Sequence, residues 1–489
     1  MRLSPRGTAT CVTLSMLAGL CAPRAIAQGD ASSNPKPSTA PSLFLRAERV
    51  VVRPGHVLEN AAVLVSNGKI TAVGADLTKP EGAQELTAKV ICAGFIDPWS
   101  ALGISGDALR DAGTSPATRA VDALDLQSDE PLRREALRAG VTSVRVQAGT
   151  TSRVSGVSAV LRVAPGLPTE AAVVDAAAAV GMSVGLTANA SNSGPSFEIV
   201  DGQVVQRDRG SRGMDPFDRL ADVDRVASAI ESGRNYLIAK NEYRHDLEEW
   251  QKKIAEKETE LDKDFKKAKK DREKEEKDAK EKGKKFEEKK YKEDKKPQAP
   301  RFDDDAEVLA SVADGDLPLA VQVNRFAELR GLLSGTEKQD RVRLVLVGAS
   351  EAIPLAARLV ERHIPVILAP ALNGRGAPDE FEAADLSLPA RLARSGVGVF
   401  LGSGGLDPAA TRDLPLLVQL AIGNGLDRDA AFDALTLGAA RLFDVDDRIG
   451  SVERGKDADL LLLDGDPLTS GGRVRYVVSA GRLVVTPEG

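Results

Sequence analysis

Alternating apolar and polar residues mark two stretches near the ends of the chain. Residues 43–77 read LFLRAERVVVRPGHVLENAAVLVSNGKITAVGADL, and the SNGK at 66–69 is typical of a hairpin turn. Residues 450–485 show the same pattern of short strands and tight turns. An apolar period of two predicts half-buried strands. We therefore expect one composite β-sandwich, built from residues 43–92 and 441–489.

The middle of the chain alternates short apolar runs with helical patterns. The runs with strand character are GVTSVRVQ (140–147), LPLAVQV (317–323), RLVLVG (343–348), IPVILAP (364–370) and GVGVFLGSG (396–404). Strands that alternate with helices form parallel sheets with helical crossovers. Over residues 93–440 this pattern predicts an α/β fold, a (β/α)8 barrel of the TIM type.

One charged segment does not fit a barrel. Residues 256–300 are dominated by interleaved Lys and Glu. Apolar residues recur at helical spacing before and within its first part, at Leu247, Trp250, Ile254, Leu261 and Phe265. We expect a charged helical insertion at 242–300, an exposed helix or helical hairpin of coiled-coil character. Two interpretations stay open: a solvated face that contacts nothing, or a docking arm for a partner or an acidic surface.

The first residues have the pattern of an export signal. Positive charge, a short apolar run and the small residues of AIA at 25–27 predict a signal peptide over residues 1–27. The Ser- and Pro-rich residues 28–42 predict a flexible linker. No other run is long enough to cross a membrane, so we expect an exported protein, periplasmic or secreted. Cleavage would leave Cys92 as the single cysteine, in an apolar run typical of the core.

The charge balance and the number of histidines bear on two classes of function, nucleic-acid binding and metal-dependent hydrolysis. The 489 residues include 66 Lys and Arg against 72 Asp and Glu, and this mild acidic excess gives no case for nucleic-acid binding. The chain has only 3 histidines, at His56, His245 and His363. We expect His56 and His245 to be exposed and His363 to be structural, in a helix-to-strand turn. So few histidines are unusual for a hydrolytic metal enzyme.

Four motifs together carry a family resemblance. They are NAAVLVSNGKITAVG (60–74), VICAGFID (90–97), ALRAGVTSVRV (136–146) and TLGAARLFDVDDRIGSVERGKDADLLLLDGDP (436–467). In combination they resemble the amidohydrolase superfamily, especially its imidazolonepropionase-like and prolidase-like branch. The resemblance covers about residues 43–489, apart from the charged insertion. It implies hydrolysis of C–N bonds with one or two divalent metals, such as zinc, in the barrel mouth.

The family's site positions fall on residues that do not reproduce a histidine-rich metal site. They correspond to Trp99 and Ala101 for the His-x-His motif, Arg162 for the carboxylated lysine, Gln322 and Gly348 for two further histidines, and Gly404 for the catalytic Asp. A guanidinium stays protonated, so it cannot form the lysine's carbamate. The resemblance is therefore to a metal hydrolase whose site is dismantled, and we expect no metal cofactor.

The replacing residues allow two interpretations of the barrel mouth. Either Trp99 fills the mouth with core-like packing, or it stacks on a small-molecule ligand with Gln322 and Arg162 as polar contacts. Asp97, from the entry motif, is expected to be a structural residue that forms hydrogen bonds.

Acidic residues elsewhere are expected to be structural. Asp407 and Asp413 follow the last strand and can reach the mouth, but such residues usually cap helices. Asp457, Asp459 and Asp464 belong to turns of the sheet domain.

Three hypotheses follow. The first is an exported, catalytically impaired amidohydrolase-family protein that acts as a binding module or as a partner subunit, in a homo-oligomer or with an active relative. The second is an active enzyme for cyclic amides or dipeptides with an unusual site drawn from Asp97, Asp413, Gln322 and Arg162. The third is a receptor for sugars or peptides that uses the blocked mouth.

Overall fold

In this computed structural model, the described residues are 42–104, 106–109, 113–127, 130–150, 152–184, 196–200, 203–207, 216–279, 295–369 and 385–487. The predicted signal peptide and nearly all of the predicted linker lie outside these residues. No helix among them is both long enough and apolar enough to span a membrane.

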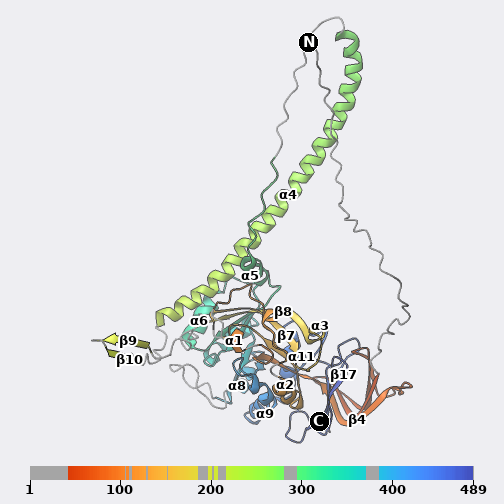
Figure 1. Cartoon of the computed structure of the whole chain (residues 1–489), viewed down its shortest axis with the longest axis vertical. Helices are drawn as coiled ribbons and strands as arrows, with labels where there is room; N and C mark the ends of the chain where they lie inside the picture. Colours follow the sequence, from red (N-terminus) through yellow and green to blue (C-terminus); the bar gives the residue numbers. More distant parts are fainter. Residues whose placement is uncertain are drawn as a thin grey trace. The chain divides into compact units, whose positions relative to one another are not determined.

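One sheet contains strands from both ends of the chain. Its seven strands run in the order β17-β16-β15-β4-β1-β2-β3. Their bounds are β1 Leu43–Arg53, β2 His56–Ser66, β3 Lys69–Gly74, β4 Gln84–Ala93, β15 Leu460–Leu463, β16 Val474–Ser479 and β17 Arg482–Val485. The two halves join where β15 pairs antiparallel with β4. Figure 1 shows β4 and β17, from the two ends of the chain, in the same region. Strands from both ends of the chain thus share one sheet.

This sheet curls over a core of its own. Ile70 on the edge strand β3 and Val478 near the opposite edge belong to the same buried cluster. The turn between β2 and β3 contacts the segment before β15, where the Ala458 N–H donates to the Gly68 carbonyl oxygen at 2.9 Å. Gly481 has φ +75°, and a Cβ there would lie 2.4 Å from the Gly68 Cα, so only glycine fits this contact. The predicted sandwich is thus one continuous, strongly curved sheet.

The second sheet is a nearly closed barrel. Its eight strands run in the order β14-β13-β12-β11-β8-β7-β6-β5. Their bounds are β5 Phe95–Ser100, β6 Val141–Val146, β7 Val154–Arg162, β8 Val173–Ser183, β11 Leu319–Val323, β12 Leu344–Gly348, β13 Val366–Leu368 and β14 Val399–Leu401. The five strand segments predicted between residues 140 and 404 all lie in this sheet.

The barrel departs from a fully parallel (β/α)8 pattern at β7. This strand runs antiparallel to both neighbours, β6 and β8. Only residues 147–153 join β6 to β7. A parallel crossover needs about a dozen residues or more, so this short connection forces the chain to turn back. The prediction of parallel strands throughout was wrong here, and β7 itself was not predicted.

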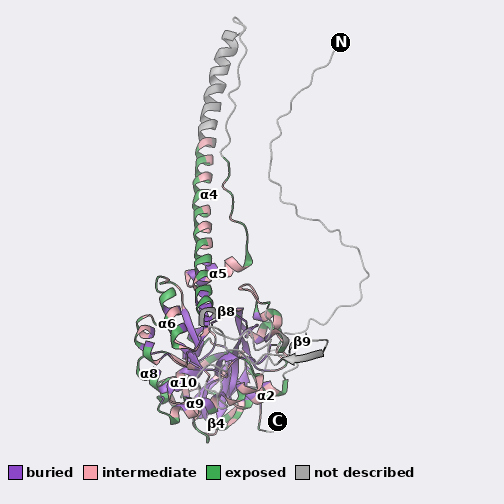
Figure 2. Ribbon diagram, turned by 90° about the vertical axis from the view of Figure 1, so that its left-hand side faces the viewer, coloured by how far each residue is buried: buried purple, intermediate pink, exposed green. Residues whose placement is uncertain are grey.

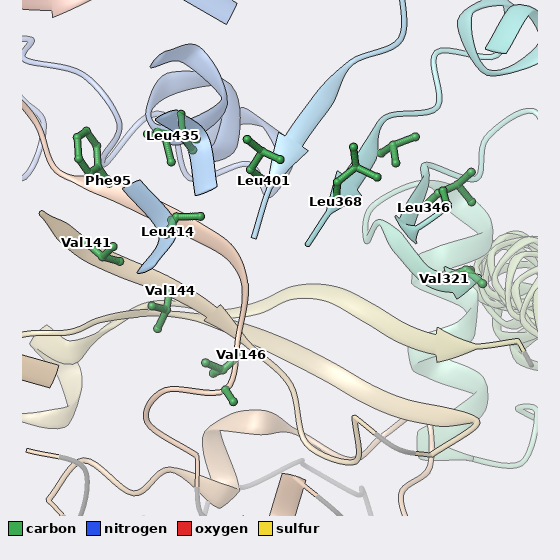
Figure 3. Packing of buried hydrophobic residues seen from close by; sticks show 14 of the residues in the cluster. Phe95, Val141, Val144, Val146, Val321, Leu346, Leu368, Leu401, Leu414 and Leu435 are labelled. Carbon is green, nitrogen blue, oxygen red and sulfur yellow. The ribbon is translucent and has the colours of Figure 1, made fainter. Parts of the chain in front are cut away.

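Two hydrophobic layers hold the barrel. The outer faces of the strands pack on helices, and Figure 3 shows part of this layer, including Val144, Leu346 and Leu401. The inner faces form a separate cluster that includes Ile96, Ala320 and Val345. The helices are α2 Glu130–Arg138, α5 Asp304–Asp314, α6 Phe326–Gly335, α7 Ala356–Glu361, α8 Leu388–Arg394, α9 Leu414–Gly423, α10 Arg428–Leu435 and α11 Leu437–Leu442, with short α1 Gly106–Leu109 and α3 Thr169–Ala172.

The charged segment is part of one long helix, α4, which runs from Pro216 to Ala279. Its first turns are buried against α5 and α6, where Arg219 forms an ion pair with Glu328 at 3.1 Å. Exposure increases from the base of the helix toward residue 257 (Figure 2). The insertion was predicted to start at 242, but the helix starts earlier because its first turns belong to the outer layer of the barrel. A hairpin of β9 Ser196–Val200 and β10 Gln203–Arg207, not predicted, precedes it.

Candidate functional site

Trp99 lies in the inner core of the barrel at the carboxyl end of β5. The side chain is 7% exposed and packs in the same cluster as Val347 and Ile367. The loop after β14 lies directly on the indole: a Cβ added to Gly405 would lie 2.3 Å from Trp99 Nε1, and one added to Gly402 would lie 2.8 Å from Trp99 Cβ. Trp99 therefore occupies the mouth as a packed core residue.

Three other residues stand where the resemblance puts metal ligands or the catalytic Asp, and they too lack a side chain that can bind a metal. Ala101 is fully buried in the outer hydrophobic layer. Gly348 has φ +89°, and a Cβ there would lie 2.3 Å from Asn324 Oδ1, so a histidine does not fit without rearrangement. Gly404 has φ +113°, a backbone conformation that disfavours any side chain.

Arg162 is not in the mouth. It lies opposite Ser143, near the start of β6, because β7 runs antiparallel. Its Nη2 donates to Asp457 Oδ2 at 2.6 Å, and its Nε donates to Asp459 Oδ2 at 2.9 Å. This position does not suit the alternative interpretation, in which Arg162 and Gln322 are polar contacts of a ligand stacked on Trp99.

The Arg162 cluster joins the barrel to the curled sheet. Arg448 also donates to Asp457, and Lys69 Nζ lies 2.9 Å from Asp457 Oδ1. Burial alone would raise the pKa of Asp457, but Lys69, Arg162 and Arg448 more than offset it and hold that pKa below its usual value. The structural role predicted for Asp457 and Asp459 agrees with these contacts.

Sequence reasoning missed a set of polar side chains inside the barrel. Arg145 is buried, and its Nε donates to Ser158 Oγ at 2.9 Å and its Nη2 to Gln147 Oε1 at 2.8 Å. Its guanidinium lies over the Phe443 ring, 5.2 Å from the centroid, and burial lowers the pKa of Arg145 to about 10. The signal was present in TSVRVQ (142–147), whose polar residues alternate along a strand that is buried on both faces.

Several buried polar atoms have no hydrogen-bond partner among the described residues. They are Asp97 Oδ2, Trp99 Nε1, Ser143 Oγ, Ser183 Oγ and Gln322 Oε1. Gln322 shares the inner face of β11 with Ala320, and Ser183 lies beside it on β8. Unsatisfied buried groups are rare in folded proteins, so their concentration along the barrel lumen marks it as a place for polar ligands or solvent.

Asp97 links β5 to the segment after β14, the two edge strands of the barrel sheet. Its Oδ1 accepts hydrogen bonds from the backbone N–H groups of Trp99 and Ser403, both at 3.1 Å. Complete burial raises the pKa of Asp97 to about 7, although bonds from Ser403, Trp99 and Thr411 act in the opposite direction. The predicted role as a structural residue that forms hydrogen bonds agrees with this geometry.

The remaining candidate residues lie away from the lumen. Asp407 caps the 3-10 helix Pro408–Asp413 by accepting from Ala409 N at 2.9 Å, as expected of a capping residue. The Asp413 side chain is about half exposed, lies 3.8 Å from Arg412 and makes no capping bond. His56, His245 and His363 are all exposed, and they lie on β2, on α4 and in the turn between α7 and β13. Cys92 is fully buried, which raises the pKa of its thiol far above the usual range.

A metal of the family's kind does not fit the side chains in this mouth. Four of the positions that the resemblance assigns to the site hold Trp99, Ala101, Gly348 and Gly404, none of which can bind a metal through its side chain. Arg162 lies at the other end of the barrel. Across the part of the chain that the structure describes, no three His, Cys, Asp or Glu residues come together as a metal site would require. Of the residues at the family positions, Gln322 alone brings an oxygen to the lumen.

Comparisons with known proteins agree with the barrel fold. Residues 303–484 match the Amidohydrolase family. An amidohydrolase structure from Thermotoga maritima MSB8 aligns with 91% of this chain and 100% of its own at 22% identity, with a TM-score of 0.65. A prolidase solved with N-methylphosphonate-L-proline is 16% identical, with 91% of this chain and 100% of the prolidase covered, at a TM-score of 0.48. A Xaa-Pro dipeptidase with bound methionine is 13% identical, with 90% of this chain and 99% of the dipeptidase covered, at a TM-score of 0.45.

No curated protein sequence matches the chain. The family match covers the second half of the barrel and the return to the sheet, while the shared fold extends over both domains. Residues 303–484 therefore match the Amidohydrolase family, and the nearly closed eight-stranded barrel agrees with the fold of the Thermotoga maritima amidohydrolase.

Proposed function

We propose that this protein is an exported amidohydrolase-family member that has lost metal-dependent hydrolysis and acts as a partner subunit or binding module. One observation carries the proposal: Trp99, at a family ligand position, is packed as a core residue under the loop at 402–405. An ion at the mouth would require that the indole leave the inner core. No second histidine-rich site can be built from three exposed histidines on β2, on α4 and in the turn between α7 and β13.

The exposed part of α4 supports the partner role. Tyr243, Leu247, Trp250 and Ile254 are half-buried at spacings of four, three and four, the repeat by which helices pair in coiled coils. The surrounding residues are charged and exposed, with i,i+4 pairs such as Lys253 with Glu249 at 3.6 Å. A seam of this kind suits a partner helix, from a second copy or from an active relative.

Export rests on the leader pattern of residues 1–27 and is part of the proposal. N-terminal sequencing of protein recovered from the native cell envelope or medium would test it. We expect Gln28 as the first residue. An N-terminus at Met1, with the protein in the cytosolic fraction, would contradict export.

Hydrolysis is tested with a panel of dipeptides, N-acyl amino acids and cyclic amides, with and without added zinc or manganese. We expect no turnover that depends on the protein. Turnover that a chelator abolishes and metal restores would overturn the proposal.

A second candidate function is metal-free acid–base catalysis by Asp97. It is favoured by one observation: this buried carboxyl has a pKa of about 7 and an Oδ2 with no partner among the described residues. Turnover in the same panel that resists the chelator and is lost in Asp97→Asn would favour this candidate.

A further inference from the structure

A cavity of about 480 Å³ lies outside the barrel, away from the mouth. It is enclosed by the end of α2, the start of α9 and the strands β15 to β17 of the curled sheet. Phe95 lines it from the first residue of β5, whereas Trp99 lies near the last residue of that strand. The cavity volume is in the range of small-molecule sites, which is about 300–1,000 Å³.

The charge around this cavity is of one sign. Four arginines line it, Arg138, Arg412, Arg473 and Arg475, and none of the lining residues is Asp or Glu. This is a local reversal in a chain whose formal net charge is −6. Four cations around one concave surface repel one another, and an anion placed among them would relieve that repulsion.

Two of the four arginines already have carboxylate partners outside the cavity. Arg412 pairs with Glu135 at 2.5 Å and lies 3.8 Å from Asp413, and Arg475 pairs with Asp464 at 3.5 Å.

Arg138 and Arg473 differ from that pair. Neither forms an ion pair or side-chain hydrogen bond with any residue that the structure describes. Their guanidinium donors are therefore available to a bound carboxylate or phosphate, for which bidentate arginine contacts are well suited.

The rest of the lining is apolar with a few hydroxyls. Pro415, Pro467 and Val474 are half-buried apolar residues of the wall, and Thr469, Ser470 and Thr486 bring hydroxyl groups. An inorganic anion would leave the apolar wall unused. A ligand with an anionic head and an apolar body would satisfy both parts of the lining.

From this lining we infer that the cavity binds a small organic anion, with a carboxylate or phosphate head held by Arg138 and Arg473 and an apolar body against Pro415 and Val474. The site lies outside the barrel lumen, so it does not depend on the proposed loss of hydrolysis. Binding there would test the arginine cavity alone, whatever the metal content or turnover of the protein.

Calorimetric titration of the full chain with phenylacetate and phenyl phosphate tests the inference. We expect saturable binding near one ligand per chain for at least one of them, and at least tenfold weaker binding of neutral phenylacetamide and of inorganic phosphate. Phenylacetamide that binds as well as phenylacetate would overturn the role of charge. Inorganic phosphate that binds as well as phenyl phosphate would contradict the contribution of the apolar wall to binding.

The double variant Arg138→Gln/Arg473→Gln should weaken binding at least tenfold. Arg234→Gln/Arg330→Gln makes the same change of charge at exposed positions outside the cavity and should leave binding unchanged. Because all four side chains are exposed, both variants are expected to fold, and the melting temperature checks this. Absence of saturable binding, or an equal loss in both variants, would overturn the proposal.

Discussion

A single tryptophan carries most of the proposal that this barrel holds no metal. Trp99 sits where the resemblance puts the first ligand, and its indole is enclosed by the inner core and by Gly402 and Gly405. The two glycines matter because a Cβ at either position would collide with the ring. The residues of the mouth are thus mutually adapted to packing.

Truncation of this side chain should be costly. Trp99→Ala should lower the free energy of unfolding by about 3–5 kcal/mol, because a buried ring is lost and a cavity remains. Denaturant unfolding measures this, and Phe302→Ala, at an aromatic residue that is 69% exposed, is the control, with about 1 kcal/mol or less expected. Equal small losses in both variants would show that Trp99 is not a core residue.

Asp97 predicts a specific dependence of stability on pH. Its folded pKa of about 7 lies above the unfolded value of about 3.9, so between these values the folded state binds more protons. The stabilisation is therefore complete below about pH 4 and is lost as pH rises through 7. Relative to Asp97→Asn, the wild type should lose a few kcal/mol of unfolding free energy across this range. A constant difference would contradict the raised pKa.

At the scale of elements, the antiparallel β7 explains where sequence reasoning failed. The five strands with clear apolar runs were predicted, and so was the joining of both chain ends in one sheet. The polar positions within 154–162 hid the strand, and a parallel barrel was assumed, so Arg162 was assigned to the wrong end. Pairing direction depends on a short connection and on tertiary contacts, which an apolar pattern does not specify.

The Arg162 cluster should be a strong link between the two sheets. Arg162→Met leaves Asp457 and Asp459 buried beside fewer cations, and it should cost about 3–5 kcal/mol in unfolding free energy. Arg53→Met removes an exposed pair with Glu453 and should cost about 1 kcal/mol or less. Urea unfolding of both variants decides this, and a cost for Arg162→Met no larger than that of Arg53→Met would contradict the link.

At the scale of the molecule, we propose that an amidohydrolase-like framework is kept while its metal site is lost. The barrel and the curled sheet are retained, the mouth is packed, and α4 adds an exposed charged helix. The framework could be read from motifs because they encode turns and core contacts. The polar lumen and the arginine cavity could not, since each is assembled from residues far apart in the chain.

The exposed part of α4 should govern self-association. Replacing residues 242–300 with a short Gly/Ser linker keeps Tyr236, Lys240 and Glu307, whose contacts hold the base of the helix. We expect light scattering to give a multiple of the single-chain mass for the intact protein and the single-chain mass for the variant, at an unchanged melting temperature. An intact protein that is monomeric at tens of micromolar would contradict pairing through this helix with a second copy.

Metal content tests the central claim most directly. The mature protein would be purified from cells supplemented with zinc and manganese, dialysed, and analysed by mass spectrometry for metals. The packed mouth around Trp99 predicts close to zero metal per chain. About one metal or more per chain, surviving dialysis, would contradict the dismantled site and restore the hydrolase interpretation.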